Sequence, residues 1–214
     1  MLRPTSGESG TLDTYSTSKY TPWYTYRSQI TSVEIRSKVV LPANSYALFY
    51  NLSNITSFTG LENLDVIGAT SLAQMFSGCS KVASLDLSSW KTGSVTSMNQ
   101  MFNNCAKITS LDSIIKWDTG KVTNMASMFY GSGLVSIDLS GWDTGELTNI
   151  GSMFQGCKSL VSLNFKADGG KWTTTNVTGM SGVFQNCTNL ASLDLGNWDT
   201  GSATSMSYEQ PMVV

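Results

Sequence analysis

Residues 82–105 read VASLDLSSWKTGSVTSMNQMFNNC, and this stretch contains both signals that decide the fold. Its first six residues follow the pattern L-x-x-L-x-L, whose last part alternates apolar and polar residues as a short β-strand does. Met98, Met101 and Phe102 then fall at positions i, i+3 and i+4, the spacing of one face of a helix. The stretch predicts a strand, a turn around Trp90 and a short helix.

The same pattern recurs along the chain at a nearly constant period. The strand signal begins at positions 25 to 30 residues apart: Ile30, Ile55, Val82, Ile108, Leu134, Leu160 and Leu190. An apolar residue followed by Phe marks most units, and in four of them a Trp precedes that Phe by 12 residues: Trp90, Trp117, Trp142 and Trp172. Because neither half of a unit can bury its apolar face alone, the repeat predicts units stacked in a solenoid.

A strand signal of this kind and period is typical of leucine-rich repeats. We expect an α/β repeat solenoid: a right-handed superhelix with one short parallel strand and one short helix in each coil of 25–30 residues. Residues 1–29 are expected to form an N-terminal tail and cap, with Trp23, Tyr24 and Tyr26 covering the first coil. Residues 30–206 are expected to form the solenoid, and residues 207–214 a frayed C-terminal end.

Tryptophan stands where such repeats usually carry Asn or Cys. We expect the Trp column to lack the backbone hydrogen bonding that an Asn ladder supplies. A threonine six residues after each Trp or its equivalent is expected to provide that bonding instead, at Thr70, Thr96, Thr123, Thr148, Thr178 and Thr204.

Two longer segments resemble a known repeat. IDLSGWDTG at residues 137–145 and WDTGKVTNMASMF at residues 117–129 are similar to the bacterial surface-protein 26-residue repeat of the BspA-like leucine-rich-repeat surface proteins. The resemblance extends over residues 30–206. It implies an exported cell-surface protein that adheres to or recognises a partner, and its pattern contains no catalytic residues to carry over.

Composition excludes several classes of function. The 214-residue chain has no histidine, which removes His-dependent triads and ordinary zinc enzymes. A formal net charge of −2, with only 13% charged residues, offers no broad electrostatic footprint for nucleic acid. No apolar stretch is long enough to insert directly into a membrane, and residues 1–20 do not resemble a signal peptide. These exclusions agree with the non-enzymatic role that the resemblance implies. The cell-surface location that the resemblance also implies would need a signal and an anchor that lie outside this chain.

The four cysteines occupy one position of the repeat, three residues after the Phe: Cys79, Cys105, Cys157 and Cys187. Ser132 fills that place in the middle unit. Adjacent coils would bring cysteines close enough for disulfides, and the alternative is a column of small buried thiols. A zinc site is not expected, because thiols spread along a solenoid do not converge.

The middle position of the strand signal provides the candidate binding column. Its members are Glu34, Thr59, Asp86, Asp112, Asp138, Asn164 and Asp194. Carboxylates on neighbouring coils repel by about 1–3 kcal/mol per pair, so something must offset that repulsion. One account is hydrogen bonding to neighbouring hydroxyl groups and turn amides. The other is an acidic strip that binds a basic ligand, or calcium on Asp86, Asp112 and Asp138; no other metal or cofactor is expected.

One unit is longer than the others, with four extra residues before Trp172. Insertions in solenoids bulge from one face, often the binding face, so Lys166, Asp168 and Lys171 are further contact candidates. The alternative is a tolerated loop. The lengthened unit also predicts that Trp172 is more exposed than its equivalents.

Together these features favour an adhesion or recognition module that binds a host or cell-surface protein or glycan through a rigid repeat surface. An identical carboxylate ladder on successive coils indicates structure rather than a glycosidase site, and no G-x-S-x-G motif occurs. The alternative function is a structural spacer or a self-assembling subunit of a surface layer or phage tail.

Overall fold

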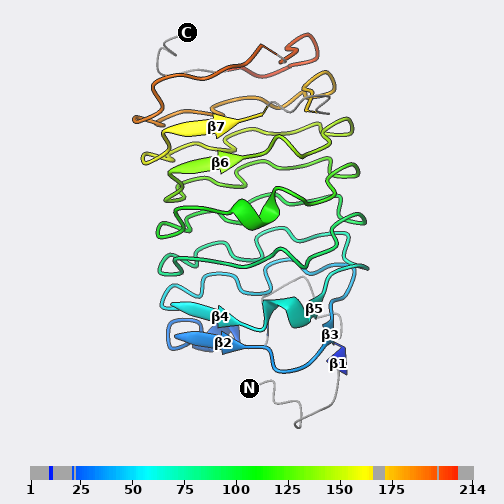
Figure 1. The fold of residues 1–214 in the computed structure, drawn as a ribbon, viewed down its shortest axis with the longest axis vertical. Helices are drawn as coiled ribbons and strands as arrows, with labels where there is room; N and C mark the ends of the chain where they lie inside the picture. The colour runs from blue at the N-terminus through cyan, green and yellow to red at the C-terminus, as the bar shows by residue number, and fades with distance from the viewer. Residues whose placement is uncertain (1–9, 12–20, 22, 166–171, 197, 207–214) are drawn as a thin grey trace.

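The computed structural model describes residues 10–11, 21, 23–165, 172–196 and 198–206. These residues wind into a stack of coils, in which each coil lies on the preceding one along the long axis of the molecule (Figure 1). Segments one repeat apart pair in parallel, so the expected repeat solenoid is confirmed. Among the described residues no helix is both long and apolar enough to cross a membrane.

Regular elements are short, with strands of two or three residues and 3-10 helices of three residues. The elements are β1 (Gly10–Thr11), η1 (Tyr24–Tyr26), β2 (Ser32–Glu34), β3 (Val39–Val40), β4 (Ser57–Thr59), η2 (Leu61–Asn63), β5 (Leu64–Asp65), η3 (Asp112–Ile114), β6 (Ser136–Asp138) and β7 (Ser162–Asn164). Parallel pairing joins β1 to β3, β3 to β5, β2 to β4 and β6 to β7. Val33 lies opposite Phe58, and Ile137 lies opposite Leu163. One sequence repeat is therefore one coil.

The predicted strand forms in only some coils. β2 with β4 and β6 with β7 confirm it, whereas residues 82–87, 108–111 and 191–195 form no strand. In the coil that begins at Ile108, one extra residue separates Leu111 from Trp117, and η3 accommodates it. The expectation of one strand in every coil is therefore wrong. In the coil that begins at Ile108, the extra residue changes the path of the chain between strand and turn.

The predicted helix in each coil is also wrong. Where it was expected, the described residues form a continuous ladder of parallel β-bridges that joins successive coils. The bridged residues, in order, are Asn44, Ser71, Ser97, Asn124, Asn149, Gly179 and Ser205. In an α-helix the N–H groups would bond within their own segment, whereas here they bond to the next coil.

The segment after each bridge shows how this ladder is built. Met98, Gln100 and Phe102 donate their N–H groups to carbonyls of the following coil at 2.9 Å. Turns within the segment bond Met101 N–H to the Met98 carbonyl, and Gln100 and Asn104 have positive φ angles. Alternate residues therefore face the next coil, and all of these N–H groups point toward the C-terminal end of the stack. The spacing i, i+3, i+4 also suits these turns, so it did not distinguish them from a helix.

Phenylalanine forms the centre of the core. Ring centroids of neighbouring coils are 5.3 to 5.8 Å apart along the stacked series Phe49, Phe76, Phe102, Phe129, Phe154 and Phe184. Methionines beside them, including Met98 and Met128, are fully buried. Coil stacking thus converts a repeated Met-Phe pair into one continuous apolar column that each coil completes for its neighbour.

The indole groups do bond to the backbone, contrary to the expectation for this column. Nε1 of Trp90, Trp117 and Trp142 donates to a carbonyl of the preceding coil at 3.0 to 3.2 Å. The acceptors are the carbonyls of Leu61, Leu87 and Ile114. A buried Trp side chain needs a partner for its N–H group, and this column supplies one by the same inter-coil geometry that an Asn ladder uses.

The last two tryptophans depart from this arrangement. Nε1 of Trp172 and of Trp198 is buried and has no hydrogen-bond partner in the structure. Phe165 stands where three other coils carry Leu87, Leu139 and Leu195, and its ring lies 4.4 Å from that of Trp172 and 5.4 Å from that of Trp198. The prediction that Trp172 is exposed is wrong, since its relative exposure is 4%.

The threonine prediction is confirmed. Each Oγ1 in the series donates to the carbonyl one coil back at 2.9 to 3.3 Å, at Thr70, Thr96, Thr123, Thr148, Thr178 and Thr204. The first coil is also covered as expected: the Trp23 ring stacks on Phe49, and Tyr24 stacks on Tyr50. Tyr26 instead remains exposed.

Replacing Trp142 by Phe should show how much the indole hydrogen bond contributes to the unfolding free energy. Trp142→Phe removes the indole bond to the Ile114 carbonyl, which still accepts from the Trp117 N–H, so we expect a loss of about 0.5–1.5 kcal/mol in unfolding free energy from the hydrogen bond. Trp172→Phe removes a similar volume but no hydrogen bond, and should lose less. Urea denaturation of both variants measures the difference, and an equal loss would contradict the role assigned to the indole.

Candidate functional site

The predicted binding column lies on the strand face, which here means the outward side of the strand signals in successive coils. Six of its seven members are exposed, and Asp138 is half-buried. The exposed members named as candidates are Glu34, Asp86, Asp112, Asn164 and Asp194. β-pairing places Asp138 directly opposite Asn164. A second outward column is serine, at Ser32, Ser57, Ser84, Ser110, Ser136, Ser162 and Ser192. The face therefore presents hydroxyl and carboxylate groups in parallel rows.

Local hydrogen bonds and an ion pair offset the repulsion between most of the carboxylates in this column. Oδ1 of Asp86 accepts from both N–H and Oγ of Ser88, at 3.1 and 2.7 Å, and these bonds lower the pKa of Asp86. Oδ1 of Asp194 accepts from Gly196 N–H at 2.9 Å. Glu34 pairs with Arg36 at 2.7 Å, and this bond lowers the carboxyl pKa. The account based on turn amides and hydroxyl groups is thus confirmed for Asp86 and Asp194, whereas Glu34 is held by an ion pair.

Asp138 has the most embedded carboxylate of the column. Burial acts to raise its pKa, but hydrogen bonds from Ser140 and Asn164 outweigh burial and lower it. Oδ1 accepts from Ser140 N–H at 2.9 Å and from Asn164 Nδ2 at 3.2 Å. Repulsion along the column is reduced here because the neighbouring coil carries Asn164, an amide that donates where an acid would repel.

A groove of about 340 Å³ opens on the strand face between residues 83–86 and residues 109–113. Asp86 and Asp112 both line it, together with Ser84 and Ser110. Neither segment forms a strand, and no backbone hydrogen bond joins one to the other in this part of the structure. The Ser113 hydroxyl crosses the groove and donates to the Leu85 carbonyl at 3.3 Å, while the main chain of Ala83 and Ser84 makes no backbone hydrogen bond to residues 109–113. The main-chain groups of Ala83 and Ser84 are therefore open to a ligand or to water.

The remaining candidates gain no support from geometry. Lys166, Asp168 and Lys171 lie outside the described residues. Within the described part of the chain, no three Asp, Glu, Cys or His side chains form a group that could hold a metal ion. Calcium on Asp86, Asp112 and Asp138 stays a prediction.

The cysteine column consists of free thiols. Sγ of Cys79 and of Cys105 donates to a Phe carbonyl of the preceding coil at 3.2 Å, and the structure has both as unpaired cysteines. Burial raises the pKa of Cys79 and of Cys187 to about 12. The adjacent-coil disulfides therefore do not form, and the alternative of buried thiols is confirmed.

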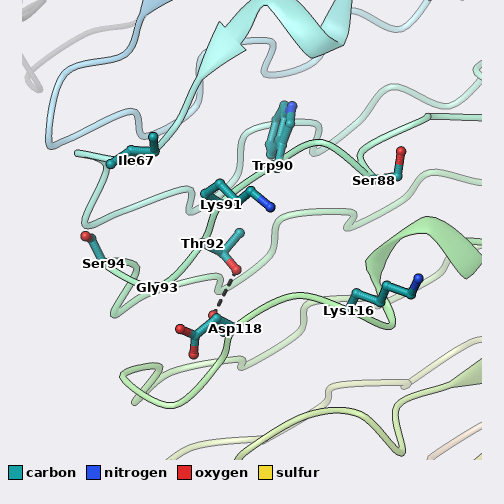
Figure 2. Close-up of a pocket in the computed structure, with 9 residues that line it drawn as sticks. All are labelled: Ile67, Ser88, Trp90, Lys91, Thr92, Gly93, Ser94, Lys116 and Asp118. Carbon is teal, nitrogen blue, oxygen red and sulfur yellow. Dashed lines mark hydrogen bonds between the residues drawn. The ribbon is translucent and has the colours of Figure 1, made fainter.

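A second hollow, which we call the lysine pocket, was missed in the sequence. Its volume is about 440 Å³, and Figure 2 shows the nine residues that line it: Ile67, Ser88, Trp90, Lys91, Thr92, Gly93, Ser94, Lys116 and Asp118. The Thr92 hydroxyl donates to the Asp118 carbonyl at 2.8 Å and ties the two coils together at its base. The signal that could have found it is Lys91, which stands where neighbouring units carry Asp65 or Asp118.

Comparison with known proteins identifies a family. Residues 44–164 and 162–210 match the family described as "Mycoplasma protein of unknown function, DUF285". Because the match covers most of the chain, the protein belongs to this family. The resemblance to BspA-like surface proteins stays a prediction.

A solved structure is also similar, the crystal structure of T. pallidum leucine-rich repeat protein (TpLRR). It is 18% identical, with a TM-score of 0.40, and the alignment covers 74% of this chain and 81% of that one. A search of curated proteins finds no match.

The contacts of Asp138 predict a measurable difference from Asp112. Asp138→Ala should lower the unfolding free energy by about 1 kcal/mol through its lost hydrogen bonds. Asp112→Ala should cost less, since no described group donates to its carboxylate. Because the Asp138 pKa is lowered in the fold, its contribution is present above the ordinary value of 3.8 and disappears as the pH falls below it. Urea unfolding at pH 7 and pH 3 measures both effects; equal losses at the two pH values would contradict this role.

The buried thiols predict alkaline sensitivity. The ordinary pKa of a cysteine thiol is 9.0 and applies to the unfolded chain, whereas burial in the fold raises the pKa of Cys79 and Cys187 to about 12. Stability from these groups is therefore complete below pH 9 and is lost as the pH rises toward 12. Replacing Cys79 and Cys105 by Ser, the residue at position 132, should make the fall shallower in pH-dependent unfolding. Reductant should leave the melting temperature unchanged, and a reductant-sensitive melting temperature would show a disulfide.

Proposed function

We propose that this protein is a recognition module that binds a protein or glycan through its strand face, and that it is not an enzyme. The observation that carries the proposal is the row of exposed Ser and acidic side chains on consecutive coils, with the groove between residues 83–86 and 109–113 in its middle. A regular array of hydroxyls, carboxylates and open main-chain groups suits a ligand with many hydrogen-bonding groups. No single constellation in it resembles a catalytic site.

Rigidity supports binding as the purpose of the array. Backbone bonds join every pair of neighbouring coils from the bridge at Asn44 to that at Ser205. A ligand that contacts several coils then meets groups already held at fixed spacing, so little conformational entropy is lost on binding. Display at a cell surface and a host or cell-surface partner follow from the resemblance to surface-protein repeats, and they belong to the proposal.

The last described coil favours a second candidate, a structural spacer or self-assembling subunit. Leu193, Leu195 and Trp198 pack against the core but are only partly buried, and Met206 is 41% exposed. Apolar groups at the end of a solenoid are suited to stacking on another solenoid unit. Sedimentation velocity over a range of concentrations tests this candidate: assembly without any added ligand favours the spacer, and a constant monomer favours the recognition module.

Binding to defined ligands tests the proposed function. The full chain is applied to an array of glycans and of purified host-matrix proteins, and so is the variant with Asp86, Asp112 and Asp138 changed to Asn. We expect the variant to weaken the captured interaction by about tenfold, because each exposed charge contributes a few tenths to 1 kcal/mol. Asn retains the oxygen that accepts the turn amide, so the fold should persist.

A matched variant controls for net charge. Asp143→Asn, Glu146→Gln and Asp199→Asn remove the same number of carboxylates away from the strand face, and this triple variant should bind as the unmodified protein does. Equal loss in both triple variants, or no capture of any arrayed ligand, would overturn the strand face as the binding surface.

A further inference from the structure

The lysine pocket is distinguished by departures from the repeat. At the position after Trp or its equivalent, most coils carry Asp, and its Oδ1 accepts a turn N–H. Oδ1 of Asp118 accepts from Gly120 and that of Asp199 from Gly201, at 3.2 and 2.8 Å. Lys91 has no acceptor atom, so its coil forgoes that bond. Lys91 cannot make the turn hydrogen bond that the equivalent Asp residues make, so the architecture of the repeat does not explain why this coil carries a lysine.

A second departure faces the same pocket. Lys116 precedes Trp117, at a position where the neighbouring coils carry Ser89 and Gly141. Both lysines are exposed, and neither forms an ion pair in the described part of the chain. Two unpaired ammonium groups therefore line one hollow, although the protein as a whole has a slight negative charge.

The rest of the lining is chemically mixed. Figure 2 shows Lys91 between Ile67 on one side and Ser88 and Lys116 on the other, with the Asp118 carboxylate beyond Thr92. The Ser88 hydroxyl donates to Oδ1 of Asp86 at 2.7 Å, so it meets a ligand as an acceptor. Gly93 leaves room for that carboxylate, since a Cβ there would lie 2.7 Å from Oδ2 of Asp118. Ile67, 59% exposed, adds an apolar wall. The pocket thus offers cationic donors, hydroxyls, one anionic acceptor and an apolar surface.

We propose that the lysine pocket binds an acidic sugar, with the sugar carboxylate between Lys91 and Lys116. The hydroxyls of the sugar meet Ser88 and the Asp118 carboxylate, and its C–H face lies toward Ile67. An acceptor carboxylate in the pocket disfavours a multiply charged anion such as phosphate, whereas it suits a ligand that also carries hydroxyl donors. This inference rests on the proposed recognition function and names one ligand class for it, at residues distinct from the strand face.

Titration calorimetry with a hyaluronan tetrasaccharide, which carries glucuronate, tests the proposal; a neutral chitin tetrasaccharide and inorganic phosphate are the comparison ligands. We expect binding of the acidic tetrasaccharide alone, weakening as salt screens the lysines. Lys91→Gln with Lys116→Gln should weaken it about tenfold, since two exposed charge pairs are lost. Lys107→Gln with Lys158→Gln removes the same charge elsewhere and should change affinity by less than about twofold.

A single variant separates binding from folding. Lys91→Asp restores the residue of the neighbouring coils and offers an acceptor to the turn, so the melting temperature should hold or rise while the acidic sugar is lost. The proposal is overturned by equal binding to the two double variants, by phosphate binding as tightly as the sugar, or by no binding to the unmodified chain. If the strand-face variants lose an arrayed ligand while hyaluronan fails to bind, only the lysine pocket is refuted. If hyaluronan binding depends on the lysines while the strand-face variants lose nothing, the strand face is refuted instead.

Discussion

Hydrogen bonding between coils, rather than within them, is the constraint on which the rest of this structure depends. After each bridge residue, alternate N–H groups donate to the next coil, as Gln100 does to the Ala126 carbonyl at 2.9 Å. The neighbouring residues are held by turns, and Gln100 itself accepts a positive φ of 56°. A left-handed conformation at a non-glycine residue costs about 1–2 kcal/mol, and the bonds it allows between coils offset that cost. Every column in the molecule follows from this regular stacking.

The period of the repeat was enough to predict a solenoid, its core and the threonine ladder. It was not enough to predict the local conformation, because Met98, Met101 and Phe102 satisfy both a helical face and a series of turns that point the same side chains inward. The helix and the series of turns differ only in which carbonyls accept from the N–H groups, and here those carbonyls lie in another coil. The indole bonds of Trp90 and Trp142 were missed for the same reason, since a carbonyl some 28 residues away is invisible to local pattern.

The repeat pattern also predicted the repeated residues of the candidate site and missed the residues that occur in one coil only. Repetition identified the acidic column correctly as an outward row, and the structure shows that Asp86 and Asp138 are largely occupied by local bonds. A residue type that recurs at the same position of every coil is accounted for by the local hydrogen bonds that each coil needs. Lys91 and Lys116 are not repeated in the other coils, so the repeat pattern does not identify them as candidate site residues. In a solenoid, the residues that differ between coils are the better guide to what the protein binds.

The prevailing direction of the inter-coil N–H groups has an electrical consequence. In an ordinary β-strand, successive peptide groups point to opposite sides and their dipoles nearly cancel. Here the donors after each bridge, such as Met98, Gln100, Phe102 and Asn104, point toward the C-terminal end, whereas Thr96 and Ser97 donate to the preceding coil. Because the forward donors outnumber the backward ones, the peptide dipoles on this face leave a net dipole along the long axis. The stack has a positive end at its last coil and a negative end at its first, so two such solenoids attract head to tail and repel head to head.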